Sequence, residues 1–295
     1  MPIREFMVLV IICLLWGGHF IVMKLTVGGI AEPIFYAAVR MGLVALVLLP
    51  KLKWHKGQMW AICFAGLCYG ALNYAFMFPA LKMTTASAAA VAIELYVPFS
   101  IIISVFVFKD KIGWRRILGI LIAFAGVALV ASAGPDQAAG PQFVLGIALI
   151  IAAALSEAIG AVLVKKVGGV GPLQLLAWFA VVGTIVLSGL SFALEKGQMS
   201  ALQGDTLKPF LMALVYSVFA VSIIGHASYY WLLQRLPIYV VATGGMLTTV
   251  FAVLFSALIL KEEMSSMLIF GGLMTLAGVG FILSRGRSKP MGPVV

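Results

Sequence analysis

The sequence predicts an all-α membrane protein in which ten transmembrane helices form two inverted five-helix repeats, with both termini in the cytoplasm. Its composition and an internal duplication carry this prediction. Of the 295 residues, 63% are apolar and only 10% are charged, whereas an ordinary soluble domain has about 25% charged residues. Soluble domains of this length could not bury so much apolar surface. The excess is therefore expected to face lipid.

Ten stretches of the chain have the length of a spanning helix, which is roughly 20 mostly apolar residues. The connections between them are short, so no extramembrane domain is expected. The first stretch resembles a signal peptide, but no small-residue cleavage site follows its apolar core, and we expect it to remain as a helix. The predicted segments are 6–26, 32–50, 57–79, 85–108, 113–132, 142–164, 170–194, 207–230, 237–260 and 265–284.

The distribution of basic residues predicts how these segments cross the membrane. With the N-terminus inside, fourteen Lys and Arg residues fall on the inner side and five on the outer side. This asymmetry predicts cytoplasmic termini in the plasma membrane, which in a bacterium is the inner membrane. The formal net charge of +10 comes from loop clusters such as KLKWHK (51–56), so no nucleic-acid partner is expected. The three cysteines lack metal-site spacing, and neither a metal nor a cofactor is expected.

A shift of 152 residues aligns SVFVFKDKIGWRRILGILIAFAGVALV (104–130) with SALILKEEMSSMLIFGGLMTLAGVGFI (256–282) without a gap. Gly119 and Gly126 align with glycines of the second stretch, and we expect them to let helices approach closely. Five helices is an odd number, so the second repeat enters the membrane in the opposite orientation. Such repeats are typical of secondary transporters, whose substrate site lies near the midplane between the halves. We place the first repeat at 1–132, a connecting loop at 133–141, the second repeat at 142–284 and a cytoplasmic tail at 285–295.

The order and spacing of several short stretches extend this interpretation. They are LLWGGHFIVMKL (14–25), PIFYAAVRMGL (33–43), FMFPALKMTTASAA (76–89), YYWLLQRLP (229–237) and LKEEM (260–264). Together they resemble the EamA group of the drug/metabolite transporter superfamily, and the resemblance covers essentially the whole chain. It implies a ten-helix bundle around a central cavity, and export or exchange of small metabolites, amino acids among them.

The second repeat departs from the pattern of that family. It has GMLTTVFAV (245–253) where a Glu-Pro pair is usual, and ALSEAIGAVLVKK (154–166) lacks the Trp-Gly pair of the first helix. By the 152-residue shift, the equivalent of Glu94 is Met246. The two halves of the cavity are thus chemically unequal, which weakens any transfer of substrate identity from relatives.

Glu94 lies within AAAVAIELYVPFS (88–100), an otherwise apolar stretch. A carboxylate at the centre of a spanning helix costs about 2.5–3.5 kcal/mol on insertion scales. Small residues share its helical face, which predicts a cavity-facing or protein-facing side. Pro98 lacks an N–H, so we expect the Glu94 carbonyl to lose its helical partner and to receive, with the carboxylate, an ammonium group, a water or a proton. The alternative is a protonated Glu94 that hydrogen-bonds a neighbouring helix.

Glu157 is the second acid at depth, and it either binds a cation or proton with Glu94 or links two helices. His19 follows Trp16 at helical spacing beside a glycine pair, and it either titrates near physiological pH or hydrogen-bonds a backbone carbonyl. Arg40 resembles the arginine of the family in the second helix. It requires an anionic substrate group or a carboxylate such as Glu94, unless it snorkels to the interface.

Further candidates for contact with substrate are polar or aromatic side chains in the apolar segments. Aromatic rings recognise apolar groups and cations, but they also form the ordinary belt at the membrane interface. These candidates are Asn73, Tyr74, Tyr96, Trp178, His226 and Tyr229.

The sequence therefore predicts a transporter of small metabolites, with amino acids or related amphipathic compounds first, working by alternating access. The chain has no G-x-x-x-x-G-K-[ST] motif for ATP hydrolysis. A proton-coupled exporter of cationic drugs is the alternative, and an intramembrane enzyme is a remote one, since no metalloprotease or Gly-x-Ser-x-Gly motif is present. Expected partners are a small-molecule substrate and membrane lipid. The oligomeric state is open between monomer and homodimer.

Overall fold

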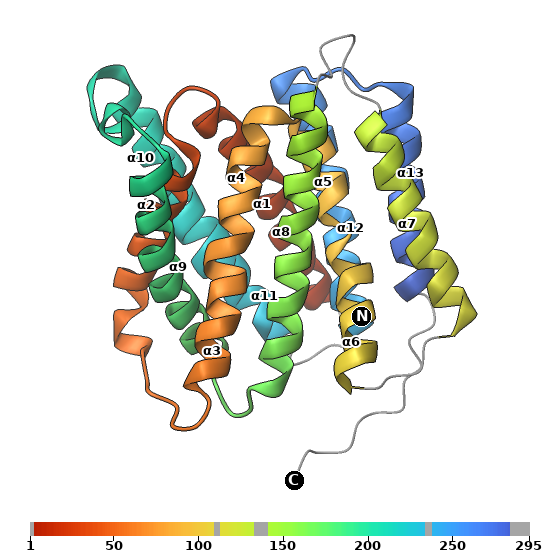
Figure 1. Cartoon of the computed structure of the whole chain (residues 1–295), viewed down its shortest axis with the longest axis horizontal. Helices are drawn as coiled ribbons and strands as arrows, with labels where there is room; N and C mark the ends of the chain where they lie inside the picture. Colours follow the sequence, from red (N-terminus) through yellow and green to blue (C-terminus); the bar gives the residue numbers. More distant parts are fainter. Residues whose placement is uncertain (1–2, 109–112, 133–140, 234–237, 284–295) are drawn as a thin grey trace.

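The computed structural model describes residues 3–108, 113–132, 141–233 and 238–283, all of which belong to helices or short connections (Figure 1). The predicted tail and almost all of the predicted connecting loop lie outside these residues. The α-helices are α1 Ile3–Val27, α2 Pro33–Leu48, α3 Met59–Gly66, α4 Asn73–Met83, α5 Ala86–Ile93, α6 Tyr96–Phe108, α7 Trp114–Ser132, α8 Pro141–Lys166, α9 Pro172–Leu194, α10 Leu207–Val215, α11 His226–Leu233, α12 Ile238–Phe255 and α13 Ser266–Leu283. Short 3₁₀ segments are η1 Leu49–Lys51, η3 Gln198–Leu202 and η4 Gly204–Thr206; π-helical segments are η2 Leu67–Leu72, η5 Tyr216–Gly225 and η6 Ser256–Leu260.

Nine helical segments of the described residues are long and apolar enough to cross a membrane. Several consist of consecutive elements, as in Met59–Met83, which joins α3, η2 and α4. The ninth predicted segment, 237–260, contains α12 and η6, and its part Gly245–Leu260 is a shorter apolar helix. Large apolar side chains are exposed on the outer surface of the bundle; Phe106 is 80% exposed and Phe192 is 89% exposed. An all-α membrane protein is confirmed.

Helices α7 and α13 pack closely side by side along glycines (Figure 1). A Cβ atom on Gly126 would lie 2.6 Å from the Gly271 carbonyl oxygen, and one on Gly278 would lie 2.6 Å from the Gly119 carbonyl oxygen. Any larger residue would therefore separate the two backbones. The close helix approach predicted for these glycines is confirmed.

Two glutamates cap helices that lie far from them in the chain. Glu195, after α9, accepts the Ile34 and Phe35 N–H groups of α2 at 2.7 and 2.8 Å. Glu262, after η6, accepts the Ala86 and Ser87 N–H groups of α5 at 2.7 and 3.1 Å. These N–H groups have no partner within their own helix, and a carboxylate also complements the positive end of the helix dipole. We call this end of the bundle, upper in Figure 1, the capped end.

Three irregular stretches interrupt the spanning segments. η2 and η5 are π-helical, and the chain tightens between α5 and α6 around Glu94. π-Helical turns inside α-helices are frequent at functional sites. Polar residues of the bundle interior that lie on or beside these stretches are Asn73, Glu94, Ser217 and Ser222.

Candidate functional site

The backbone at Glu94 does not carry the free carbonyl that the sequence predicts. Pro98 indeed offers no N–H, but the Val97 N–H donates to the Glu94 carbonyl oxygen at 3.1 Å. The chain has shifted to an i→i+3 hydrogen bond, as 3₁₀ turns do. The expected carbonyl receptor is therefore wrong, and only the carboxylate remains available for a ligand.

The Glu94 side chain is only 3% exposed. Its Oε1 accepts a hydrogen bond from Thr249 Oγ1 of α12 at 2.6 Å, while its Oε2 is buried without a hydrogen-bond partner in the structure. A buried polar atom without a partner costs about 1–3 kcal/mol. The acid thus comes from the first half of the chain, its positioning hydroxyl comes from the second half, and one oxygen is available for a proton or a donor.

Glu157 projects from α8 toward the same region. The Asn73 Nδ2 of α4 donates to Glu157 Oε2 at 3.2 Å and to the Ala153 carbonyl at 3.1 Å. Glu157 and Glu94 lie close enough to interact electrostatically. Two carboxylates in one buried region repel each other when both are ionised, so a proton or a cationic group shared by them is favourable. The structure therefore brings these two predicted residues together.

Aromatic side chains border the two acids. Tyr96, the first residue of α6, lies within electrostatic reach of Glu94, Glu157 and Tyr229. The Trp16 ring of α1 lies 5.2 Å from the Tyr229 ring, centroid to centroid. Rings at this separation pack favourably. Six predicted site residues thus share one region with contributions from both halves of the chain: Trp16, Asn73, Glu94, Tyr96, Glu157 and Tyr229.

His226 and Trp16 are held by the π-helical segment η5. The two rings lie 5.3 Å apart, and the Val221 carbonyl lies 3.0 Å from His226 Nδ1 and 3.4 Å from Trp16 Nε1. A π-helix displaces its carbonyls from the regular ladder, so they can accept from side chains. This local irregularity orients both predicted residues.

Arg40 of α2 lies in a separate, basic part of the interior and is only 1% exposed. Its Nη2 donates to Ser222 Oγ at 3.0 Å, and its guanidinium carbon lies 4.9 Å from the centroid of the Tyr74 ring. Its Nε and Nη1 are buried without a hydrogen-bond partner. The single ion pair among the described residues joins Lys82 and Glu32 at the surface. Arg40 neither snorkels nor pairs with Glu94.

His19 is a neighbour of this basic region. Its Nε2 lies 3.2 Å from Ser217 Oγ, and the same Ser217 Oγ lies 2.5 Å from the Tyr36 hydroxyl. Arg40 and His226 are both within electrostatic reach of His19. The contact that the structure shows is with a hydroxyl rather than with the backbone carbonyl that one alternative expected. Titration of His19 near physiological pH stays a prediction.

Trp178 is not brought to either region. Its Nε1 donates to the Lys53 carbonyl at 3.0 Å, and its ring meets the Trp54 ring edge-on at 5.9 Å. Both contacts lie at the end of the bundle opposite the capped end, where aromatic residues of membrane proteins commonly gather.

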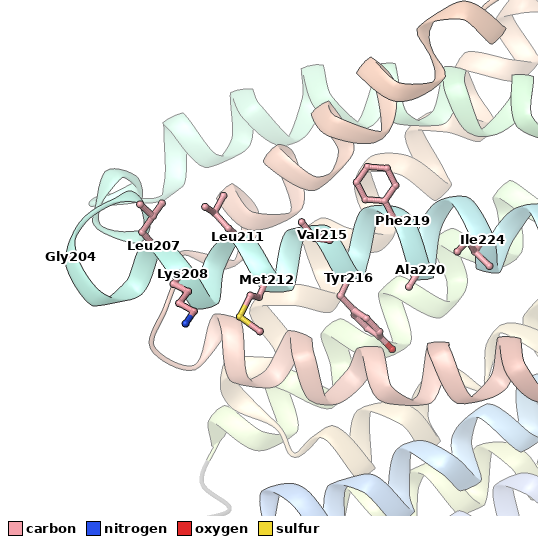
Figure 2. A pocket seen from close by; sticks show the side chains of 10 residues that line it. All are labelled: Gly204, Leu207, Lys208, Leu211, Met212, Val215, Tyr216, Phe219, Ala220 and Ile224. Carbon is pink, nitrogen blue, oxygen red and sulfur yellow. The ribbon is translucent and has the colours of Figure 1, made fainter.

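A groove of about 800 Å³ runs along the outer side of one helix (Figure 2). Its lining residues belong to η4, α10 and η5, and Figure 2 shows Leu211 and Phe219 along one flank and Tyr216 on the other. Leu211, Met212 and Phe219 are exposed apolar side chains, so this groove lies on the apolar outer surface of the bundle. Tyr216 connects it to the interior, because its hydroxyl donates to the Leu15 carbonyl at 2.6 Å. The buried polar residues are the better candidate site.

Sequence reasoning missed the hydroxyl partners of the site. Thr249 holds Glu94, Ser222 binds Arg40 and Ser217 binds His19. Ser217 and Ser222 are five residues apart, a spacing that separates them on an α-helix but aligns them on the π-helix η5, where the Ser222 hydroxyl donates to the Ser217 carbonyl at 2.9 Å. Hydroxyls inside apolar segments were the available signal, but their partners depend on the local helix type.

The EamA-like transporter family model matches residues 4–132 and 144–284. A probable amino-acid metabolite efflux pump of Salmonella typhimurium strain LT2 is 25% identical over 276 residues, covering 91% of each chain. An uncharacterized transporter of Archaeoglobus fulgidus is 27% identical over 94% of this chain and 96% of its own. A probable amino-acid metabolite efflux pump of Escherichia coli K12 is 24% identical over 91% of each chain. A crystal structure 16% identical in sequence shares the fold with a TM-score of 0.65, covering 95% of this chain and 96% of that one.

Proposed function

Since this chain belongs to the EamA-like transporter family, we propose that it is a secondary transporter that exports or exchanges amino acids or related amphipathic metabolites by alternating access. It is a multi-pass protein of the plasma membrane. Its family and the relatives described above are transporters, and none of those relatives is named as an enzyme.

The observation that carries this proposal is the buried Glu94 carboxylate with one oxygen unpartnered. An ammonium group is the natural occupant, because it donates hydrogen bonds and neutralises charge in a medium of low dielectric constant. Glu157 adds a second acid, and the Trp16 and Tyr229 rings present faces that attract cations. The names of two relatives as amino-acid metabolite efflux pumps support amino acids as the substrate class.

Contacts between α7 and α13 support two halves that are related as an inverted repeat and move relative to each other during transport. Under the 152-residue shift, the pair Gly119 and Gly278 becomes the pair Gly271 and Gly126, which is the other observed contact. Contact pairs that exchange in this way are expected of a two-fold relation between the halves. Two five-helix halves related so would rock about the central site and expose it to each side in turn.

The second candidate is a proton-coupled exporter of cationic compounds. It is favoured by the proximity of Glu94 and Glu157, since two buried acids can exchange a proton for a cation. The two candidates are separated by measuring, in one transport assay, whether L-amino acids or lipophilic cations compete for the site.

The test is counterflow in proteoliposomes with wild type and Glu94→Gln. We expect saturable, stereoselective counterflow in the wild type, and roughly tenfold or greater loss in Glu94→Gln, since a buried charge contact is worth more than about 1.4 kcal/mol. Glu32→Gln is the matched control because Glu32 lies at the surface. Unsaturable flux, or wild-type counterflow in Glu94→Gln, would contradict the proposal.

A further inference from the structure

Three charged side chains at depth in the described spanning helices lie in two regions. The acids Glu94 and Glu157 lie with α5, α8 and α12, and Arg40 lies with α2 and η5. Two consecutive residues of α4 contact the two regions, since Asn73 binds Glu157 and Tyr74 packs on Arg40. The acidic and basic regions are therefore neighbours without forming an ion pair among the described residues.

The surroundings of Arg40 consist of donors and rings. Its electrostatic neighbours are His19, Tyr36 and His226, and its contacts are Ser222 and Tyr74. No carboxylate is close enough for an ion pair in the part of the chain that the structure describes. An isolated cation in the membrane interior is costly, and such residues normally pair or mark a ligand pathway. An anion is the component that this region lacks.

The guanidinium geometry favours a small planar anion. Nε and Nη1 carry most of the N–H donors of Arg40, and both are buried without a partner. The guanidinium carbon lies over the Tyr74 ring, 4.9 Å from its centroid, and an anion that accepts hydrogen bonds from these donors lies at the guanidinium edge. In-plane approach at hydrogen-bonding distance is how arginine recognises carboxylates.

We propose that Arg40 is the carboxylate-binding half of the transport site, and that the transported substrate is a zwitterion. Resting on the proposed function, this assigns the substrate ammonium group to Glu94 and its carboxylate to unpartnered N–H donors on one edge of the Arg40 guanidinium. The substrate then lies beside Asn73 and Tyr74 and bridges the two regions. Compounds with only one of the two charges leave one buried ionised group unpaired, which is the physical basis of their weaker binding.

The experiment measures thermal unfolding of the full chain in nanodiscs with three probes of equal side-chain size. These are L-leucine, 3-methylbutylamine, which lacks the carboxylate, and 4-methylpentanoate, which lacks the amine. We expect L-leucine to stabilise the protein most, and 4-methylpentanoate to bind measurably. Arg40→Gln should weaken the apparent affinity for L-leucine and 4-methylpentanoate roughly 30-fold or more and leave that for 3-methylbutylamine within a factor of about three. Glu94→Gln should do the reverse.

Two controls keep the test decisive. Arg40→Lys retains the charge and should keep part of the carboxylate response, and it replaces Arg40→Gln if that variant does not fold. Sodium chloride against sodium sulfate at constant ionic strength tests whether an inorganic anion occupies the site. Equal carboxylate binding in wild type and in both Arg40 variants, saturable stabilisation by chloride that 4-methylpentanoate does not displace, or no carboxylate binding at all would each overturn the proposal. Because these readouts are binding, they are independent of counterflow, whose absence would overturn the proposed transport function instead.

Discussion

The α7–α13 contact and the α5–α12 contact each join two helices that the 152-residue shift relates. The two contacts differ in chemistry. Gly119 and Gly126 meet Gly278 and Gly271, so both halves contribute the same residue type. At the second contact, Glu94 meets Thr249, and the 152-residue shift places no acid opposite it. The halves are alike where helices pack and unlike where a charge is buried.

This difference separates two demands on a duplicated chain. Close packing of two backbones requires small residues on both sides, so a change on one side is harmful to both. A site for an asymmetric solute requires different groups on its two sides, and one copy of an acid is then sufficient. We therefore expect substitutions at the glycine contact to affect stability, and substitutions at the Glu94 contact to affect transport.

The largest effect is expected for Gly126→Leu. A Cβ there would already lie 2.4 Å from Thr275 Oγ1, so a larger side chain must separate α7 from α13. Overpacking of this kind costs about 1–3 kcal/mol or more. Thermal unfolding in detergent or nanodiscs should show a marked loss of stability. The control is Gly189→Ala, where no atom lies within 4 Å of an added Cβ; equal stability of the two variants would show that the contact is not a packing contact.

The next effect in size is expected for Thr249→Val, which keeps the side-chain shape but removes the donor to Glu94 Oε1. Apparent substrate affinity in counterflow should fall about tenfold, the equivalent of about 1.4 kcal/mol. Thr249→Ser should restore most of the affinity, since its hydroxyl can reach the same oxygen. An unchanged affinity in Thr249→Val would remove Thr249 from the site.

The smallest effect is expected at the capped end with Glu262→Ala. This change leaves the Ala86 and Ser87 N–H groups without a partner and should lower stability by about 0.5–2 kcal/mol, as loss of a helix cap does. Glu263→Ala is the matched neighbour, because Glu263 is exposed. Similar unfolding temperatures for the two variants would argue that the cap contributes nothing, and Glu195 would then be tested the same way.

Much of the fold could be predicted from the sequence because apolar length and basic loops are strong signals. Each predicted segment overlaps a helix of the structure, most within a few residues at each end. The π-helical segments could not be predicted, since the choice between α and π ladders depends on side chains from other helices, such as Tyr36 and His19 at Ser217. The inverted arrangement and the cytoplasmic termini stay predictions.

For the candidate site, the cost of burying a charge singled out the acids but not the residues around them. Glu94, Glu157 and Arg40 stand out because a charge in an apolar segment requires a reason. Thr249 and Ser222 do not stand out, because a Ser or Thr hydroxyl commonly hydrogen-bonds a backbone carbonyl of its own helix. Trp178 was selected as an aromatic residue in an apolar segment, yet it contacts Lys53 and Trp54 instead of the acids.

The caps at Glu195 and Glu262 have a consequence for biosynthesis. The α2 and α5 N–H groups that they accept lie 161 and 176 residues earlier in the chain. At synthesis rates of about 5–20 residues per second, those helix ends wait roughly 8 to 35 s for their partners. During that interval water or lipid headgroups must solvate them, so these two helix ends have to stay in contact with the interface until the second half arrives.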